Sequence, residues 1–194
     1  MYLYLVRHGE SVGNAEQLFF GWKDYPLTER GREQAEKAAE KLRAIPFRRC
    51  CASDLSRAWE TALICTAGRE IEPERCPDLR EQHLGAMEGM TWEEAQDVFA
   101  DALEAYLQDW RCPLPTAEPY AHMLRRVSDC VQEIMERGED TLIVAHNGSL
   151  TLILSCLGLI GERELTDMSF QFRFGCFSAV RIDNTGAELT EWNR

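Results

Sequence analysis

The first strand of the chain and the turn that ends it constrain the fold more than any other segment. Residues 3–6, Leu-Tyr-Leu-Val, form a short run without Gly or Pro that is apolar on both faces. Such a run is typical of a fully buried strand at the centre of a parallel sheet. Arg7, His8 and Gly9 follow at its carboxyl end, where α/β proteins place their chemistry. We therefore expect an α/β fold with a functional site that begins at this turn.

Charge and composition indicate one globular domain that spans residues 1–194. The chain has 33 acidic and 21 basic residues, which gives a net charge of −12. This sign disfavours nucleic acid and anionic membranes as partners, and we expect neither a transmembrane segment nor a signal peptide. Its eight cysteines include no C-x-x-C pair. We therefore expect reduced thiols in a cytoplasmic protein and no metal site.

Apolar runs and amphipathic segments alternate along the rest of the chain. We expect strands at 47–53, 141–146, 175–182 and 188–192, helices at 27–45, 55–67, 91–110, 120–137 and 150–157, and loops at 9–27, 70–90 and 112–119. This alternation predicts a three-layer α/β/α sandwich with a mostly parallel central sheet and an antiparallel edge. The loop and helix at about 79–117 are expected to form an inserted cap.

A second buried run, residues 141–145, also ends in a histidine, His146. Parallel neighbouring strands would bring His146 and His8 together at one edge of the sheet. Asn147 and Gly148 follow, and their N–H groups at a helix start form an anion site that needs no side chain.

Arg57 lies in the first turn of a predicted helix, where a cation is unfavourable unless an anion compensates it. The alternative is a solvent-facing arginine paired with Asp54 or Glu60. Together with Arg7, the two histidines and the helix start, Arg57 would complete a pocket for a dianion such as phosphate.

This set of side chains also predicts a reaction. A neutral histidine whose other nitrogen is held by a backbone carbonyl is a nucleophile toward phosphorus. The leaving oxygen then needs a proton donor. Glu81, in the Gly-rich and polar loop 79–89, is the candidate, and Glu88 and Glu10 are the reserves.

Five blocks along nearly the full chain resemble the histidine phosphatase (phosphoglycerate mutase-like) superfamily. They are Arg7-His8-Gly9-Glu10 with Asn14, Gly21-Trp22-x-Asp24-x-Pro26-Leu27-Thr28, Ser53-Asp54-Leu55-x-Arg57-Ala58, Glu81 with Leu84-Gly85-x-Met87-Glu88-Gly89, and Val144-Ala145-His146. Their spacing is most similar to the alpha-ribazole phosphatase branch and to small broad-specificity phosphatases.

The resemblance implies a covalent phosphohistidine at His8 and a phosphate pocket formed by Arg7, Arg57 and His146. It implies that Asn14 and Gly21 help to bind phosphate and that Glu81 acts as acid and then as base. The substrate would be a small phosphomonoester, such as alpha-ribazole phosphate or a sugar phosphate. No metal or cofactor is implied, and the protein would act either alone or as a homodimer.

Three positions depart from the pattern of the family, and they bear on substrate identity. Asn147 stands where many relatives have Gly, Thr151 where they often have Arg, and Pro119 where Ser is usual. The remaining histidines, His83 and His122, are interpreted as surface or packing residues.

Phosphoglycerate mutase-type phosphotransfer is the main alternative to hydrolysis. A mutase must shield its intermediate from water, and mutases of the family have a longer insertion after loop 79–89 and a C-terminal tail. Here residues 90–117 supply one helix and a turn, and the chain ends just after its last strand, so we expect hydrolysis. A non-catalytic phospho-ligand-binding protein on the same fold is a further alternative. A metal-dependent hydrolase is disfavoured, because the sequence contains no metal-ligand motif such as H-E-x-x-H.

The aromatic residues Phe19, Phe20 and Trp22 allow two interpretations. They could stack on an aromatic leaving group near the phosphate pocket, or they could pack within their own loop.

Overall fold

Within the residues that the computed structural model describes, 1–166 and 170–194, six strands form one mixed sheet. They are β1 (Tyr2–Arg7), β2 (Arg49–Ala52), β3 (Glu74–Arg75), β4 (Thr141–Ala145), β5 (Phe177–Asp183) and β6 (Gly186–Glu191). Their order across the sheet is β3-β2-β4-β1-β5-β6. The first four strands pair in parallel, whereas β5 and β6 are antiparallel to their neighbours. The predicted parallel sheet with an antiparallel edge is confirmed.

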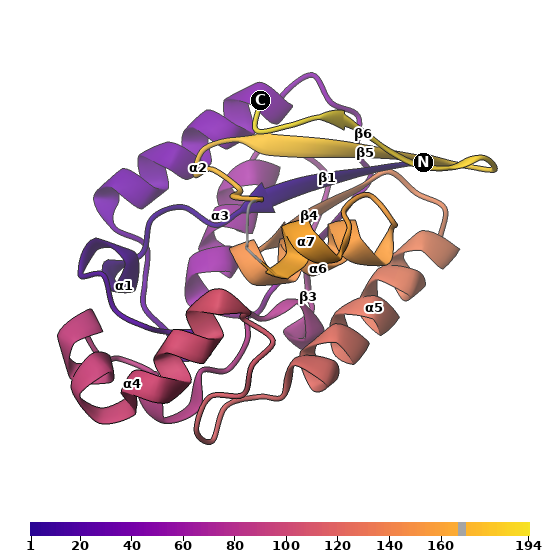
Figure 1. The fold of residues 1–194 in the computed structure, drawn as a ribbon. Coiled ribbons are helices and arrows are strands. Elements are labelled where there is room, and N and C mark those ends of the chain that lie inside the picture. The colour runs from indigo at the N-terminus through magenta and orange to yellow at the C-terminus, as the bar shows by residue number, and fades with distance from the viewer. Residues whose placement is uncertain (167–169) are drawn as a thin grey trace.

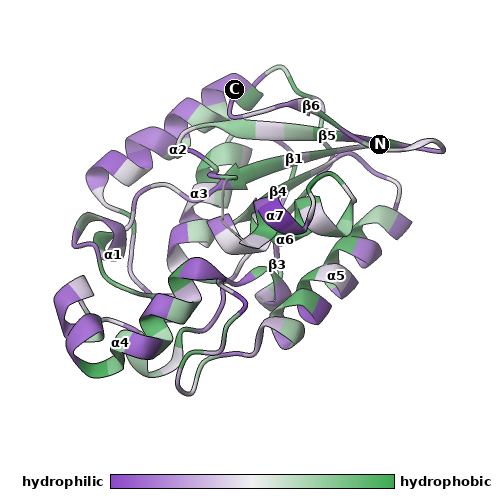
Figure 2. Cartoon of the chain, in the orientation of Figure 1, coloured by the Kyte–Doolittle hydropathy of each residue, from purple (hydrophilic) through white to green (hydrophobic). Residues whose placement is uncertain are grey.

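Helices cover both faces of this sheet (Figure 1). The helices of the described residues are α1 (Val12–Ala15), α2 (Glu29–Leu42), α3 (Ser56–Thr66), α4 (Trp92–Gln108), α5 (Tyr120–Glu136), α6 (Asn147–Cys156) and α7 (Glu162–Thr166), and of these α2, α3, α5 and α6 form the two outer layers. Alternate residues of β1 belong to two different hydrophobic cores, because side chains along a strand point to opposite faces of the sheet. Leu3 and Leu5 pack with α5 and α6, whereas Tyr4 and Val6 pack with α2 and α3. The predicted three layers are therefore confirmed, and Figure 2 shows hydrophobic residues in green along β1 at the centre of the sheet.

Helix α4 stands apart from the three layers, beyond the carboxyl end of β1 (Figure 1). Its first turn carries a capping box formed by Thr91 and Glu94. It forms a small core of its own with loop 79–89, made of Leu84, Met87, Ala95, Leu103 and Leu114. This packing brings α4 and the loop to the same edge of the sheet as His8.

Several short elements differ from the prediction. The expected loop 9–27 contains α1, and the expected loop 70–90 contains β3 and two 3-10 turns, Pro77–Leu79 and Gly85–Met87. Both residues of β3 are exposed, so no hydrophobic pattern marks this edge strand. Helix α7 was not predicted, and α6 begins directly after β4 instead of at residue 150. Other element ends shift by a few residues, as is usual where helices and strands fray.

None of the helices among the described residues is long and apolar enough to cross a membrane.

Candidate active site

His8 lies directly after β1 and is almost completely buried. Its backbone N–H donates to the carbonyl of Ala145 on β4 at 3.0 Å. Its ring Nδ1 lies 2.7 Å from the carbonyl oxygen of Gly9. A carbonyl can only accept, so Nδ1 carries the proton and Nε2 keeps a free lone pair. The tautomer that a histidine nucleophile needs is thus fixed by the backbone.

Gly9 is required by the close approach of this turn to α2. A Cβ at Gly9 would lie 2.1 Å from the carbonyl oxygen of Gly31, and a Cβ at Gly31 would lie 2.0 Å from the carbonyl oxygen of Glu10. The two glycines let the segment after β1 rest directly on the first turn of α2, which holds His8 in place.

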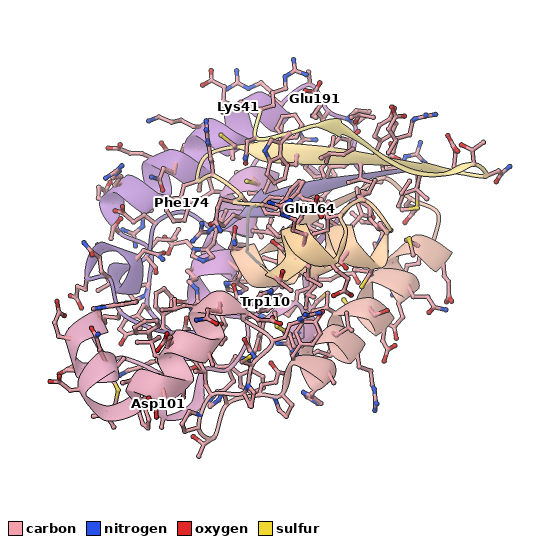
Figure 3. All side chains as sticks on the ribbon, viewed as in Figure 1. Lys41, Asp101, Trp110, Glu164, Phe174 and Glu191 are labelled. Atoms are coloured by element: carbon pink, nitrogen blue, oxygen red, sulfur yellow. The ribbon has the colours of Figure 1, made fainter. Side chains whose placement is uncertain are left out.

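Arg7 and Arg57 approach His8 from different elements. The Nη1 of Arg7 donates to the carbonyl of Phe172 at 3.1 Å, and its guanidinium lies 4.4 Å from the ring centre of Phe174, which Figure 3 labels beside the end of β1. Arg57, in the first turn of α3, is only 1% exposed and donates to the carbonyl of Gly21 at 2.6 Å. Both guanidinium groups are therefore held in place beside His8.

The alternative partners of Arg57 are engaged elsewhere. Asp54 forms an ion pair with Arg80, and Glu60 forms one with Arg32. The nearest carboxylate to Arg57 is that of Asp24 at 3.7 Å. Arg57 is thus a buried cation at the cavity and not a surface residue paired within its own helix.

His146 comes to lie against His8, with 5.0 Å between the ring centres. Its Nε2 lies 2.9 Å from the hydroxyl oxygen of Ser53. Ser53 stands shortly before α3, but the N-cap residue of that helix is Leu55, and the carboxylate of Asp24 accepts from the N–H of Ser56. Ser53 instead orients the second histidine, a role that sequence reasoning missed.

Glu81 reaches the start of α6. Its Oε2 accepts from the N–H of Gly148 at 2.9 Å, and its Oε1 accepts from the N–H of Gln82 at 3.1 Å. The N–H of Gly148, expected to bind phosphate, is therefore directed at a carboxylate of this chain. Asn147, expected in the same role, accepts from the N–H of Phe172 through its side chain at 2.9 Å.

The two alternative candidates for the proton donor, Glu88 and Glu10, have their carboxylates engaged in other contacts. Glu88 accepts from four backbone N–H groups, those of Gly21, Trp22, Lys23 and Leu84. Glu10 accepts from the hydroxyl of Thr28 and lies 3.6 Å from Arg30. Among the described residues that line the cavity, Glu81 is the one carboxylate.

A cavity of about 240 Å³ brings Arg7, His8, Arg57 and Glu81 together, whereas His146, which lies against His8, is not among the residues that line it. Its polar wall consists of Arg7, His8, Asn14, Arg57, Glu81, Gln82, Asn147 and Gly148, and its apolar wall of Leu18, Phe19, Phe20, Leu84, Tyr106 and Trp110. The carboxamide oxygen of Asn14 accepts from the N–H and the hydroxyl of Ser11, which orients the side chain at this wall. A ligand with a dianionic group for the polar wall and an apolar substituent for the apolar wall fits this cavity.

Gly21 and Trp22 lie beside the cavity but do not line it. A Cβ at Gly21 would lie 1.6 Å from the carbonyl oxygen of Gln82, and the carbonyl of Gly21 holds Arg57. The indole of Trp22 packs on His83, as the loop-packing interpretation predicts. His122 is exposed and bonds to Glu118. Of Phe19, Phe20 and Trp22, the first two line the cavity.

The apolar wall also holds residues that sequence reasoning missed. Tyr106 and Trp110 belong to the apolar stripe of the predicted helix 91–110, and nothing in that stripe distinguishes side chains that face a cavity. Gln82 carries no motif signal beyond its place after Glu81. It is buried, and its carboxamide oxygen accepts from the hydroxyl of Tyr106 at 3.2 Å.

Burial sets the electrostatics of the site. It lowers the pKa of His8 well below its ordinary value of 6.5, and the charges of Arg57 and Arg7 lower it further. Burial and Arg57 likewise lower the pKa of His146. The pKa of Arg57 itself falls to about 10, because burial opposes its charge. At neutral pH both histidines are therefore neutral and Arg57 is charged.

We expect the free energy of unfolding to decrease below pH 6.5 because of these two histidines. In the unfolded chain each binds a proton near pH 6.5, whereas in the folded protein each stays neutral to lower pH. Each therefore contributes a loss of up to about 1.4 kcal/mol per pH unit as the pH falls through this range. Urea unfolding between pH 7.5 and 5 should show a shallower dependence for His8→Asn than for the wild type. The exposed-site variant His122→Asn is the control, and equal slopes for all three proteins would contradict the assignment.

Comparisons with known proteins agree with this geometry. The profile of the histidine phosphatase superfamily (branch 1) matches residues 3–194. The adenosylcobalamin/alpha-ribazole phosphatase of Salmonella typhimurium is 33% identical over 196 residues, which cover 100% of this chain and 96% of that protein. A 2,3-bisphosphoglycerate-dependent phosphoglycerate mutase of Gloeobacter violaceus is 28% identical, covering 88% of this chain and 81% of its own. The crystal structure of an alpha-ribazole phosphatase from Shigella flexneri superposes with a TM-score of 0.91 at 29% identity, covering 100% of this chain and 96% of that chain.

Proposed function

Because the chain belongs to the histidine phosphatase superfamily, we propose that its cavity hydrolyses alpha-ribazole phosphate or a closely similar phosphomonoester through a phosphohistidine at His8. The name of the Salmonella relative, an adenosylcobalamin/alpha-ribazole phosphatase, and the apolar wall beside the phosphate pocket support this choice of substrate. The proposed reaction needs neither metal nor cofactor. A homodimer and a cytoplasmic location stay predictions.

The observation that carries the proposal is a group of unsatisfied nitrogen atoms. Among the described side chains, only four buried nitrogens lack a hydrogen-bond partner, and three of them belong to Arg7, Arg57 and His146. Buried polar groups without partners are rare and costly. Arg7 and Arg57 line the cavity beside His8, and their unsatisfied nitrogens support binding of a dianion there, because phosphoryl oxygens accept hydrogen bonds from guanidinium groups.

In the first step, Nε2 of His8 attacks phosphorus and the bond to the leaving oxygen breaks. Arg7, Arg57 and His146 stabilise the negative charge that spreads over the phosphoryl oxygens. Glu81, in its protonated form, gives its proton to the leaving oxygen. The products are the alcohol and a phosphohistidine.

In the second step, a water molecule attacks the phosphorus of the phosphohistidine. Glu81, now ionised, takes a proton from this water, and the bond between phosphorus and Nε2 breaks. Inorganic phosphate leaves, and both His8 and Glu81 return to their starting protonation states. The hydrogen bond from Gly148 keeps the carboxyl group at the helix start throughout.

The apolar wall favours a leaving group with an aromatic ring. Phe19 and Phe20 come from the segment after α1, and Tyr106 and Trp110 come from α4 and the turn that follows it. Flat aromatic groups stack well between such side chains. A ribose phosphate that carries an aromatic base would place its phosphate at His8 and its base against this wall.

A phosphate-release screen with EDTA present tests the proposed function. The panel comprises alpha-ribazole phosphate, sugar phosphates, phosphoglycerates, nucleotides and p-nitrophenyl phosphate. We expect the highest kcat/KM for alpha-ribazole phosphate and no effect of EDTA. If folded protein releases no phosphate from any compound of the panel, hydrolysis is overturned. That result would favour a mutase that needs a phosphorylated primer, or a binding protein. Loss of activity in EDTA would overturn the metal-free mechanism.

Gly148→Ala should reduce activity without reducing stability. Its Cβ would lie 2.3 Å from Oε1 of Glu81, so the carboxyl group has to move. We expect kcat/KM for alkyl phosphates to fall about 10-fold or more. The melting temperature should stay equal or rise, because alanine favours helix over glycine by about 1 kcal/mol. Ser155→Ala, in the same helix, is the control, and unchanged kcat/KM in Gly148→Ala would contradict the proposed place of Glu81.

A further inference from the structure

Arg126 on α5 uses all of its hydrogen-bond donors beneath loop 79–89. Its Nη1 donates to the carbonyls of Asp78 and Arg80, both at 2.7 Å. Its Nη2 donates to the carbonyl of Glu81 at 2.9 Å and to Oε2 of Glu118 at 2.7 Å. Its Nε donates to Oε1 of Glu118 at 2.7 Å. A guanidinium has five N–H donors, and here each one has a partner.

From this geometry we propose that Arg126 is a positioning residue for the proton transfer of Glu81. It is not among the residues that line the cavity, and it holds Glu81 through the backbone carbonyl of that residue. This inference rests on the proposed function, since it concerns the acid of that reaction.

Glu118 anchors the guanidinium. Its side chain is 4% exposed and that of Arg126 is 8% exposed, so the bidentate pair is shielded from water. The backbone of Glu118 also holds the loop, because its N–H donates to the carbonyl of His83 at 2.9 Å and its carbonyl accepts from the side chain of Gln82 at 2.9 Å. The pair therefore joins α5 to the loop on both sides of Glu81.

The backbone of Glu81 is fixed from two directions. Its carbonyl oxygen accepts from Arg126 and also from the indole N–H of Trp22 at 2.8 Å. With the backbone held, the side chain extends to the N–H of Gly148. A displacement of this carbonyl by a fraction of an ångström would move the carboxyl group relative to the leaving oxygen. Such misplacement lowers the rate of proton transfer.

Arg126→Lys tests the role of Arg126. Lysine keeps the positive charge for Glu118, but its ammonium group cannot reach two carboxylate oxygens and three carbonyls at once. We expect kcat/KM for alkyl phosphates to fall about 10-fold or more, and kcat/KM for p-nitrophenyl phosphate to change about twofold at most. The reason is that nitrophenolate leaves without a proton. A plot of log kcat/KM against leaving-group pKa should therefore become steeper.

Arg49→Lys is the matched control. Arg49, on β2, is also a largely buried arginine that pairs with a carboxylate, Glu74, and it lies far along the chain from loop 79–89. This variant should lose stability without any change in leaving-group dependence. If Arg126→Lys loses activity equally on both substrate types, or if Arg49→Lys shows the same steepening, the positioning role is wrong.

Glu118→Gln provides a second variant if Arg126→Lys does not fold. It keeps the three carbonyl contacts of Arg126 but removes a charged acceptor, so the same steepening is expected with a smaller amplitude, and its absence would also overturn the inference. Glu81→Gln separates the two proposals. Steepening in Glu81→Gln without steepening in the Arg126 and Glu118 variants would overturn the inference and leave the proposed function standing. Wild-type protein without phosphatase activity would overturn the proposed function itself.

Discussion

His8→Ala is expected to lower kcat for every phosphomonoester by a factor of about 10⁴ or more. The variant lacks the nitrogen that would bond to phosphorus, and no other described side chain of the cavity offers a neutral imidazole with a free lone pair. The fold should persist, because the backbone N–H of residue 8 keeps its bond to Ala145. Steady-state phosphate release gives kcat, and rapid-quench mass spectrometry should find a phosphorylated protein for the wild type only.

His122→Ala is the control for this experiment, because its exposed imidazole lies outside the cavity. It should keep the wild-type kcat and form the same phosphoenzyme. Residual activity of His8→Ala near the wild-type value, or a phosphorylated His8→Ala protein, would remove His8 as the nucleophile.

Glu81→Gln is expected to lower kcat/KM for alkyl phosphates by about 10² to 10⁴, the usual contribution of a positioned acid. Glutamine has nearly the same shape and can still accept from Gly148, but it has no proton to give. For p-nitrophenyl phosphate kcat/KM should change little, since this leaving group departs as a stable anion. The ratio of the two kcat/KM values is the quantity to measure.

Glu88→Gln is the matched variant for the acid role. Its carboxylate accepts from four backbone N–H groups, among them that of Trp22, so Glu88→Gln should reduce stability and change the ratio of the two kcat/KM values far less than Glu81→Gln does. If Glu88→Gln alters this ratio and Glu81→Gln does not, the proton donor is Glu88. If Glu81→Gln lowers both kcat/KM values equally, Glu81 is not the leaving-group acid.

The parts of the fold that the sequence predicts well are those with long hydrophobic patterns. Residues 3–6 and 141–145 are apolar on both faces, and this pattern suffices to place two parallel strands side by side. Because the carboxyl ends of parallel strands meet at one edge of the sheet, the proximity of His8 and His146 follows. Strand β3 and helix α7 were not predicted, because they are short and show no hydrophobic pattern.

The chemistry of the site is harder to predict, because one backbone group can serve several anions. The N–H of Gly148 was expected to bind phosphate, and it binds the carboxylate of Glu81 instead. Both anions suit a helix start, so only the folded position of loop 79–89 distinguishes them. The role of Arg126 is hidden for a similar reason. Its partners are mainly backbone carbonyls, which leave no signature in a sequence.

The unsatisfied nitrogens of Arg7, Arg57 and His146 also bear on how the enzyme ends its catalytic cycle. Inorganic phosphate, the product, offers the same oxygens to these nitrogens as the substrate does. Free enzyme and product-bound enzyme therefore differ in stability, and phosphate should protect the fold in proportion to RT ln(1 + [phosphate]/Kd). Bound phosphate also excludes the next substrate molecule, because both would occupy the same cavity. The rate of turnover in a cell would then depend on how much free phosphate the cell contains, and not on the supply of substrate alone.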